Sequence, residues 1–316
     1  MLAMLVLFAG CEKVEETDNY SLITLPENEL VRAFWQEGDT IYIAGGEKES
    51  NGFLVAYSTI ADQSKTIISG YSKGFHSVAR NPLNGELYIG MSNSDLLTVD
   101  NLGNVTPHYT EEQYWINDQK KQPLYEGHII QNRLFFIGGG DLQFGVIRKQ
   151  LDNDQFVPVE YQSELRSMVS LGGEHLLAVG NGIQITSDDL GETWDRKSSA
   201  SGYFTSVCMD TTTGKGWMTT FQGAIYNSDD NGENWEKEQT SISTLRSPFY
   251  LKRIKLLNHT DYEAAAVGNN GSLAIKPKGK SWELMHLSVD DDLNDFIELN
   301  DQLWIGGQGR IIVYPL

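Results

Sequence analysis

Cysteine is nearly absent from this 316-residue chain, which contains only Cys11 and Cys208. A disulfide framework of the kind that stabilises small secreted domains is therefore excluded. Cys208 lies between Val207 and Met209, so we expect it to be a small buried apolar residue. Proline is scarce too, with 8 residues against 31 glycines, and this balance favours many tight turns. Helical periodicity is missing as well, so we expect strands throughout.

Positive charge is the second deficit. The chain has 24 Lys and Arg residues against 43 Asp and Glu residues, and its net charge is −19. Nucleic acids are excluded as partners, because binding to phosphate backbones needs a basic face. The same negative field disfavours direct attraction to anionic lipids. We therefore expect the only membrane contact to be through an attached lipid.

What the chain does contain is a repeat. The phrases SDDLGETW at 187–194 and SDDNGENW at 228–235 lie 41 residues apart (235 minus 194), and a period of about 40 to 50 residues is typical of solenoids and propellers. In each phrase the Ser and Asp side chains can bond nearby backbone groups and the glycine supplies a positive φ, which predicts a tight hairpin. The residues that define these two turns are Ser187, Asp189, Gly191, Trp194, Ser228, Asp230, Gly232 and Trp235.

The pattern S-x-D-x-G-x-T/N-W resembles the Asp box, or BNR repeat, of sialidases, sortilin-like receptors and photosystem II assembly factor-like propellers. This resemblance implies a β-propeller in which each box lies on the turn between the third and fourth strands of a blade, away from the ligand face. The two boxes are therefore expected to be structural.

Seven short apolar runs extend the period over the whole chain, and their ends lie 38 to 48 residues apart. We expect each run to be the second strand of a blade, with a terminal glycine that permits a turn. The runs are IYIAG at 41–45, LYIG at 87–90, FFIG at 135–138, LAVG at 177–180, WMTT at 217–220, AAVG at 265–268 and LWIG at 303–306.

This count predicts an all-β chain that forms a seven-bladed β-propeller of four-stranded antiparallel blades, in a single domain at residues 20–316. The final blade ends at residues 310–316 after only three strands, so its outer strand must come from elsewhere. Residues 21–26, SLITLP, are the expected N-terminal donor, which would close the ring and cover an exposed sheet edge. A six-bladed ring with one additional hairpin is the alternative.

The N-terminus predicts a location. Residues 1–10 are apolar, too short to span a bilayer and typical of a signal segment. Cys11 follows Phe8, Ala9 and Gly10, which resembles a bacterial lipobox, and the acidic stretch 11–19 resembles the tether of surface lipoproteins of the Bacteroidetes. The resemblance implies lipidation of Cys11 and an outer-membrane lipoprotein, facing either the periplasm or the outside. A buried N-terminal strand with an incidental cysteine is the alternative.

Any ligand is expected at the mouth of the central channel, where the innermost strands begin. Alignment on the apolar runs places one column at Arg32, Ser77, His128, Ser167, Ser206, Arg253 and Asp295. The preceding column contains Val31, His76, Gly127, Arg166, Thr205, Lys252 and Asn294. The predicted ligand-binding residues are Arg32, His76, His128, Arg166, Lys252, Arg253 and Asp295, a cationic mouth that suits an anionic or hydroxyl-rich ligand. The alternative is a water-lined channel whose cations pair with neighbouring acids.

An insertion between blades two and three, residues 109–125, is polar and aromatic. Tyr114 and Trp115 are expected to stack on a sugar or peptide at the mouth, because loops on rigid scaffolds often bind ligands. A surface loop packed on its own blade is the alternative.

Two function classes remain. The first is a non-enzymatic, monomeric binding or assembly module for a protein or glycan partner. The second is a glycan-active hydrolase or lyase, for which the resemblance to sialidases implies Arg32, Arg166 and Arg253 as a carboxylate-binding triad and Asp295 as the acid. The Tyr nucleophile and its assisting Glu, which sialidases use, cannot be assigned by motif in this chain. For the binding module we predict no catalytic residue, and we predict no cofactor for either class.

Residues 227–238 nearly fit the calcium-loop formula, but strands rather than helices are expected around them, so no metal is predicted.

Overall fold

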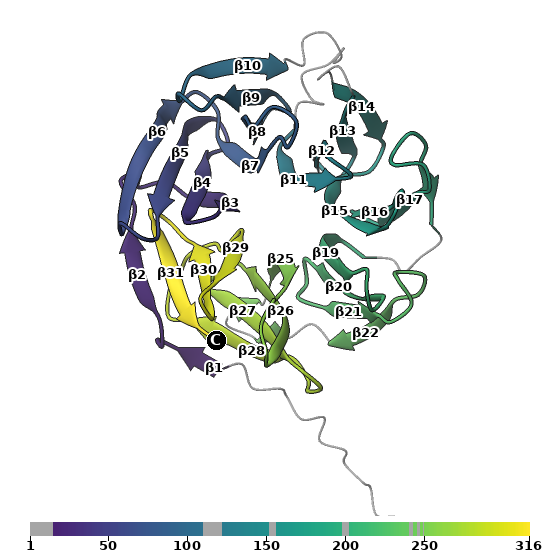
Figure 1. Cartoon of the computed structure of the whole chain (residues 1–316). Helices are drawn as coiled ribbons and strands as arrows, with labels where there is room; N and C mark the ends of the chain where they lie inside the picture. Colours follow the sequence, from purple (N-terminus) through teal and green to yellow (C-terminus); the bar gives the residue numbers. More distant parts are fainter. Residues whose placement is uncertain are drawn as a thin grey trace, which may run out of the picture.

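The computed structural model describes residues 15–109, 122–151, 156–197, 202–239, 243–244, 247–248 and 250–316. Within these ranges the chain is all-β, and seven antiparallel four-stranded units surround a central axis (Figure 1). The chain passes through the blades in order, and the first strand of each blade lies innermost (Figure 1). The predicted seven-bladed propeller is confirmed. No helix in the described ranges is long and apolar enough to cross a membrane.

Blade 1 consists of β3 (Val31–Glu37), β4 (Thr40–Glu47), β5 (Ser50–Ser58) and β6 (Gln63–Tyr71). Blade 2 consists of β7 (Phe75–Arg80), β8 (Leu87–Met91), β9 (Leu96–Val99) and β10 (Val105–Tyr109). Blade 3 consists of β11 (Leu124–Ile130), β12 (Arg133–Gly140), β13 (Phe144–Gln150) and β14 (Phe156–Tyr161). Blade 4 consists of β15 (Leu165–Gly172), β16 (His175–Gly180), β17 (Ile183–Ser187) and β18 (Asp195–Arg196). Blade 5 consists of β19 (Phe204–Asp210), β20 (Lys215–Thr220), β21 (Ile225–Ser228) and β22 (Glu236–Gln239). A small separate hairpin is formed by β23 (Ser243–Thr244) and β24 (Ser247–Pro248).

The last two blades include strands from both ends of the chain. Blade 6 contains β25 (Leu251–Leu256), β26 (Tyr262–Gly268), β27 (Ser272–Pro277) and β28 (Glu283–Leu287), with β1 (Glu15–Thr17) paired parallel to β28 at the outer edge. Blade 7 contains β29 (Phe296–Leu299), β30 (Gln302–Gly306) and β31 (Arg310–Pro315), with β2 (Ser21–Thr24) as its outer strand.

Apolar contacts between blades, rather than one central core, hold the propeller together. The described residues form seven apolar clusters, one at each junction between neighbouring blades. At the junction of blades 7 and 1, for example, Phe34 and Phe53 pack with Trp304 and Ile311. Each second strand is covered on both faces by adjacent blades, so its residues are apolar in a continuous run instead of alternating with polar ones.

The glycines that end the apolar runs of the second strands have a role that differs from the predicted one. Neither Gly138 nor Gly268 has a positive φ, so they are not needed to form a turn. A Cβ at Gly138 would collide with the carbonyl oxygen of Pro123, and one at Gly268 with that of Tyr250. Each glycine therefore makes room for the chain that enters the innermost strand of the same blade.

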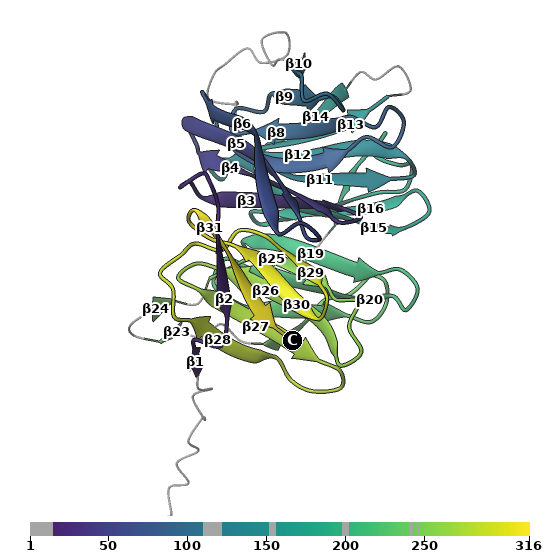
Figure 2. The ribbon, with the colours of Figure 1, turned by 60° about the vertical axis from the view of Figure 1, so that its left-hand side comes forward.

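The N-terminal strand closes the ring as predicted. β2 pairs antiparallel with β31, with Leu22 opposite Ile312 and Ile23 opposite Ile311. Figure 2 shows β2 running along the yellow strands of blade 7. The six-bladed alternative is therefore wrong. The sequence did not predict β1, which consists of residues 15–17 of the stretch expected to be a tether.

The two SDD turns join the third and fourth strands of blades 4 and 5, where they were expected. In the first, Asp189 Oδ1 accepts hydrogen bonds from the Ser187 hydroxyl and the Thr193 N–H, both at 2.8 Å, and Gly191 has a φ of 80°. Hydrogen bonds from the Thr193 side chain and backbone lower the pKa of Asp189 to about 2. The second turn repeats this arrangement around Asp230 and Gly232. In both turns the Asp carboxylate accepts hydrogen bonds from groups of its own turn.

Ring closure can be tested on β2 with two matched substitutions. Ile23 packs against the junction of blades 7 and 1, whereas the side chain of Leu22 is 48% exposed. Ile23→Asp should lower the Tm by roughly 5 °C, because it places a carboxylate against an apolar cluster. Leu22→Asp introduces the same charge on the solvent face and should change the Tm by less than about 2 °C. Equal shifts in calorimetry would show that β2 does not dock in this register.

Candidate functional site

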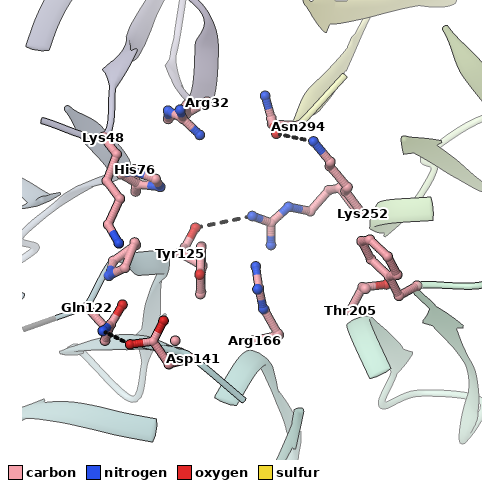
Figure 3. A pocket seen from close by; sticks show the side chains of 14 residues that line it. Arg32, Lys48, His76, Gln122, Tyr125, Asp141, Arg166, Thr205, Lys252 and Asn294 are labelled. Carbon is pink, nitrogen blue, oxygen red and sulfur yellow. Dashed lines mark hydrogen bonds between the residues drawn. The ribbon is translucent and has the colours of Figure 1, made fainter. Parts of the chain in front are cut away.

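A β-bulge at the start of the innermost strands creates the mouth of the channel. In blades 1 to 6 the pairing of the first two strands shifts by one residue immediately after the first pair. A bulge leaves one residue outside the ladder and redirects its side chain. The bulged residues are Arg32, His76, Tyr125, Arg166, Thr205 and Lys252, and Asn294 holds the equivalent place before β29. All seven line one cavity of about 410 Å³ (Figure 3).

The predicted alignment of the innermost strands is wrong in two blades. Arg32 is equivalent to His76 in the structure, not to Ser77, because the bulge of blade 1 lies one residue later than the alignment places it, at Arg32 and not at Val31. In blade 3 the bulged residue is Tyr125, two residues before Gly127, because β11 begins at Leu124. An apolar run locates a strand but does not show where an unpaired residue has been inserted.

The structure separates the predicted site residues into two cavities. Five of them, namely Arg32, His76, Arg166, Lys252 and Arg253, line the mouth cavity. His128 and Asp295 instead line a second cavity of about 450 Å³, bounded by residues farther along the same innermost strands. Tyr125 and Arg253 line both cavities and form the boundary between them. Cys11, Tyr114 and Trp115 lie outside the described residues.

Arg253 forms this boundary by reaching from blade 6 to blade 3. Its Nη1 pairs with the Glu126 carboxylate, and its Nη2 donates a hydrogen bond of 3.2 Å to the Tyr125 carbonyl. On the other side its Nε lies 3.6 Å from Asp295 Oδ1. Burial lowers the pKa of Arg253 and Asp295 opposes that effect, so the arginine is held charged between two acids.

The acids of this network also join neighbouring blades. Asp295 of blade 7 accepts a hydrogen bond of 3.0 Å from the Phe34 N–H of blade 1. Glu126 of blade 3 accepts one of 3.2 Å from the Met168 N–H of blade 4. Asp295 Oδ1 also pairs with Lys255 at 2.6 Å. Asp295, the only predicted acid for catalysis, thus has the contacts of a residue that closes the ring.

The paired cations of the mouth are held by nearby acids and aromatic rings. Arg166 pairs with Glu164, donates a hydrogen bond of 2.5 Å to the Tyr203 hydroxyl and lies with its Cζ 4.1 Å from the centroid of Tyr125. Burial opposes the charge of Arg166, but Tyr125, Glu164 and Tyr203 outweigh it and its pKa is raised. Burial raises the pKa of Tyr125 to about 12, so its hydroxyl stays protonated.

Sequence reasoning missed an aromatic ledge beside the mouth. Phe221 lines the cavity and is stacked between Tyr203 and Tyr250, with centroid distances of 5.5 and 4.7 Å. Phe221 directly follows the apolar run 217–220, so the repeat itself placed it at the mouth. Lys48 was also missed, because it lies in the hairpin between β4 and β5 and belongs to no repeated column.

Two acids of the calcium-loop pattern at 227–238 are engaged in contacts within the protein. Glu238, its final acid, accepts hydrogen bonds from the indoles of Trp217 and Trp282 at 3.0 and 3.2 Å and pairs with Lys276. Asp230 is used within its turn. Among the described residues no group of three or more His, Cys, Asp or Glu side chains is placed to hold a metal ion.

Comparisons with known proteins give the fold and nothing finer. No family model and no curated protein matches the sequence. The structure of YCF48 bound to D1 peptide superposes with a TM-score of 0.66 at 16% identity, over 96% of this chain and 98% of that one. The WD40 propeller domain of Doa1 gives 0.68 at 14% identity, over 94% and 97%. YCF48 from Cyanidioschyzon merolae gives 0.62 at 10% identity, over 94% and 99%.

His128, which lines the second cavity, predicts a pH dependence of stability. Burial, followed by the Lys255 ammonium, lowers the pKa of His128 to about 4, against about 6.5 for an unfolded chain. Between these values the unfolded chain binds more protons, so the free energy of unfolding decreases as the pH falls. The imidazole is half-buried and its Nε2 lies 2.8 Å from Glu126 Oε2, which favours the charged form and reduces the effect. In His128→Gln the loss between pH 7 and pH 5, measured by urea unfolding, should therefore be smaller than in the wild type by up to about 2 kcal/mol. Identical losses would show that the pKa of His128 is not lowered in the folded protein.

Proposed function

We propose that this propeller is a non-enzymatic binding module that takes a protein or glycan partner at the mouth of its channel. The observation that carries the proposal is the ring formed by the six bulged residues and Asn294, one residue from each blade, which turns polar and charged side chains toward one cavity. In a chain with a net charge of −19, cations from blades 1, 4 and 6 meet there. An anionic or hydroxyl-rich group suits such a lining.

The aromatic ledge supports a macromolecular partner. Phe221 and its two stacked neighbours are half-buried, and Phe221 lines the cavity together with the charged side chains. Protein partners and sugars both use exposed aromatic rings in this way. The YCF48 structure, a propeller of the same fold, is described as bound to a D1 peptide, which supports a peptide partner by analogy alone.

A glycan-active hydrolase is the second candidate. Arg32, Arg166 and Arg253 do line one cavity, and the Tyr203 hydroxyl donates a hydrogen bond of 2.9 Å to Glu164 beside it. Against it, Glu164 and Glu126 already occupy Arg166 and Arg253. Asp295 is bound to the Phe34 N–H and lies in the other cavity. Two of the three guanidinium groups are therefore already paired with acids of the protein, so the three arginines cannot all bind one substrate carboxylate as in sialidases.

We also propose that the protein is a lipid-anchored component of the bacterial cell envelope. The support is the resemblance of the segment before Cys11 to a lipobox. The acidic surface gives no other means of binding an anionic membrane.

Site-specific photo-crosslinking tests the binding proposal. A benzophenone amino acid at Phe221 in the mouth should give crosslinked adducts with one defined partner in whole cells, because the ring already faces the cavity. The same residue at Ile60, which is 78% exposed in the turn between β5 and β6, is the matched control and should give none. A glycan array probed with the purified protein covers the sugar case. Equal adducts at both positions, or none at Phe221 together with a blank array, would rule out the mouth as the binding surface.

Lipidation is tested separately. Cells expressing the chain and fed an alkyne analogue of palmitate should label it, and Cys11→Ala should abolish the label while Cys208→Ala leaves it unchanged. The difference is expected because Cys208 is buried and burial raises the pKa of its thiol to about 12, so it is not a competing nucleophile. Label that survives Cys11→Ala would overturn the anchor.

A further inference from the structure

The cations around the mouth fall into two groups according to their partners. Three are paired with carboxylates, and the pairs are Arg166 with Glu164, Arg253 with Glu126 and Lys252 with Asp292. Within the described part of the chain, the Nη atoms of Arg32 and the ammonium of Lys48 have no hydrogen-bond or ion-pair partner. The unpaired positive charge of the mouth therefore lies on blade 1.

Among the residues that the structure describes, the guanidinium of Arg32 is oriented by a hydrogen bond from its Nε alone. Its Nε donates a hydrogen bond of 2.6 Å to the carbonyl of Gly46, which orients the guanidinium while leaving the two Nη groups for a ligand. Burial lowers the pKa of Arg32, and the nearby acid Glu47 only partly compensates. A buried guanidinium in this state gains most from an anion that forms two parallel hydrogen bonds with it.

His76 supplies an independent sign of a missing ligand. Its imidazole is 7% exposed, lines the same cavity, and its Nε2 has no hydrogen-bond partner. Burial, then the charges of Arg32, Arg166 and Lys48, hold the pKa of His76 well below its usual range, so the ring is neutral at pH 7. A buried polar atom without a partner costs free energy that a bound oxyanion or water would recover. Figure 3 shows the ring on the same side of the cavity as Arg32 and Lys48.

We infer that Arg32, Lys48 and His76 form a subsite for one carboxylate group of the ligand. The inference rests on the proposed function, since the carboxylate belongs to the partner that enters the mouth. Arg32 offers the fork, Lys48 a second charge, and His76 an Nε2–H donor. A doubly charged phosphate fits less well, because Asp141 lines the same cavity and Glu47 lies near Arg32.

The test uses small anions, so it does not depend on knowing the partner. Sodium acetate and inorganic phosphate are titrated into the full chain, and the ring signal of His76, assigned by its loss in His76→Gln, is followed by NMR. In the wild type, acetate should shift this signal in a saturable way, at lower concentration than phosphate does.

A lysine outside the cavity provides the matched control. Lys48→Ala should raise the acetate concentration at half-saturation at least about fivefold, whereas Lys215→Ala removes the same charge from a lysine that pairs with Glu263 and lines neither of the two cavities, and should change it less than about twofold. Arg32→Ala should raise it at least about tenfold. All three variants should keep the circular dichroism spectrum of the wild type.

Each alternative outcome has a definite meaning. Absence of a saturable shift in the wild type, equal effects of Lys48→Ala and Lys215→Ala, or tighter binding of phosphate than of acetate would overturn the carboxylate subsite. If acetate binds as expected while Phe221 gives no crosslink and the glycan array is blank, the proposed partner binding fails and the subsite stands. If Phe221 crosslinks to a partner while acetate does not bind, the subsite alone fails.

Discussion

A single inserted residue at the start of the innermost strand in blades 1 to 6 decides what the mouth of this propeller can do. Without the bulge, strict alternation would send the side chain at that position into the contacts between blades. With it, Arg32, His76, Tyr125 and their counterparts turn toward the cavity, while the next residue joins adjacent blades. Structural and ligand-facing roles thus fall on consecutive residues. This is why Asp295 serves ring closure although its neighbour Asn294 lines the mouth.

The fold could be predicted from the sequence because its physical cause repeats. Every second strand is covered on both faces, so each blade leaves one apolar run, and the glycine that ends most runs marks the close approach of the entering chain. The closing strand was predictable from a strand count, since the last blade had only three. β1 was not, because three polar residues in a parallel edge strand carry no apolar pattern.

The site was predictable only in outline. Five of the seven predicted residues outside the insertion meet in one cavity, because they sit near the starts of the correct strands. The bulge leaves no trace in hydrophobicity, so the alignment slipped by one residue in blade 1 and by two in blade 3, and Tyr125 was lost. Pairing of the mouth cations with acids was an open alternative, but the sequence did not show which acids take part. Glu164 neutralises Arg166 from two residues earlier in the chain, and Glu126 neutralises Arg253 from across the ring.

The short strand β1 determines where the N-terminal part of the described chain meets the propeller. Because it pairs with β28 on the outer edge of blade 6, the chain joins the ring at its circumference, close to β2 and far from the axis (Figure 1). A force applied to the chain at Glu15 would therefore act on the rim of the propeller, and the β1–β28 pairing would be the first contact to bear it.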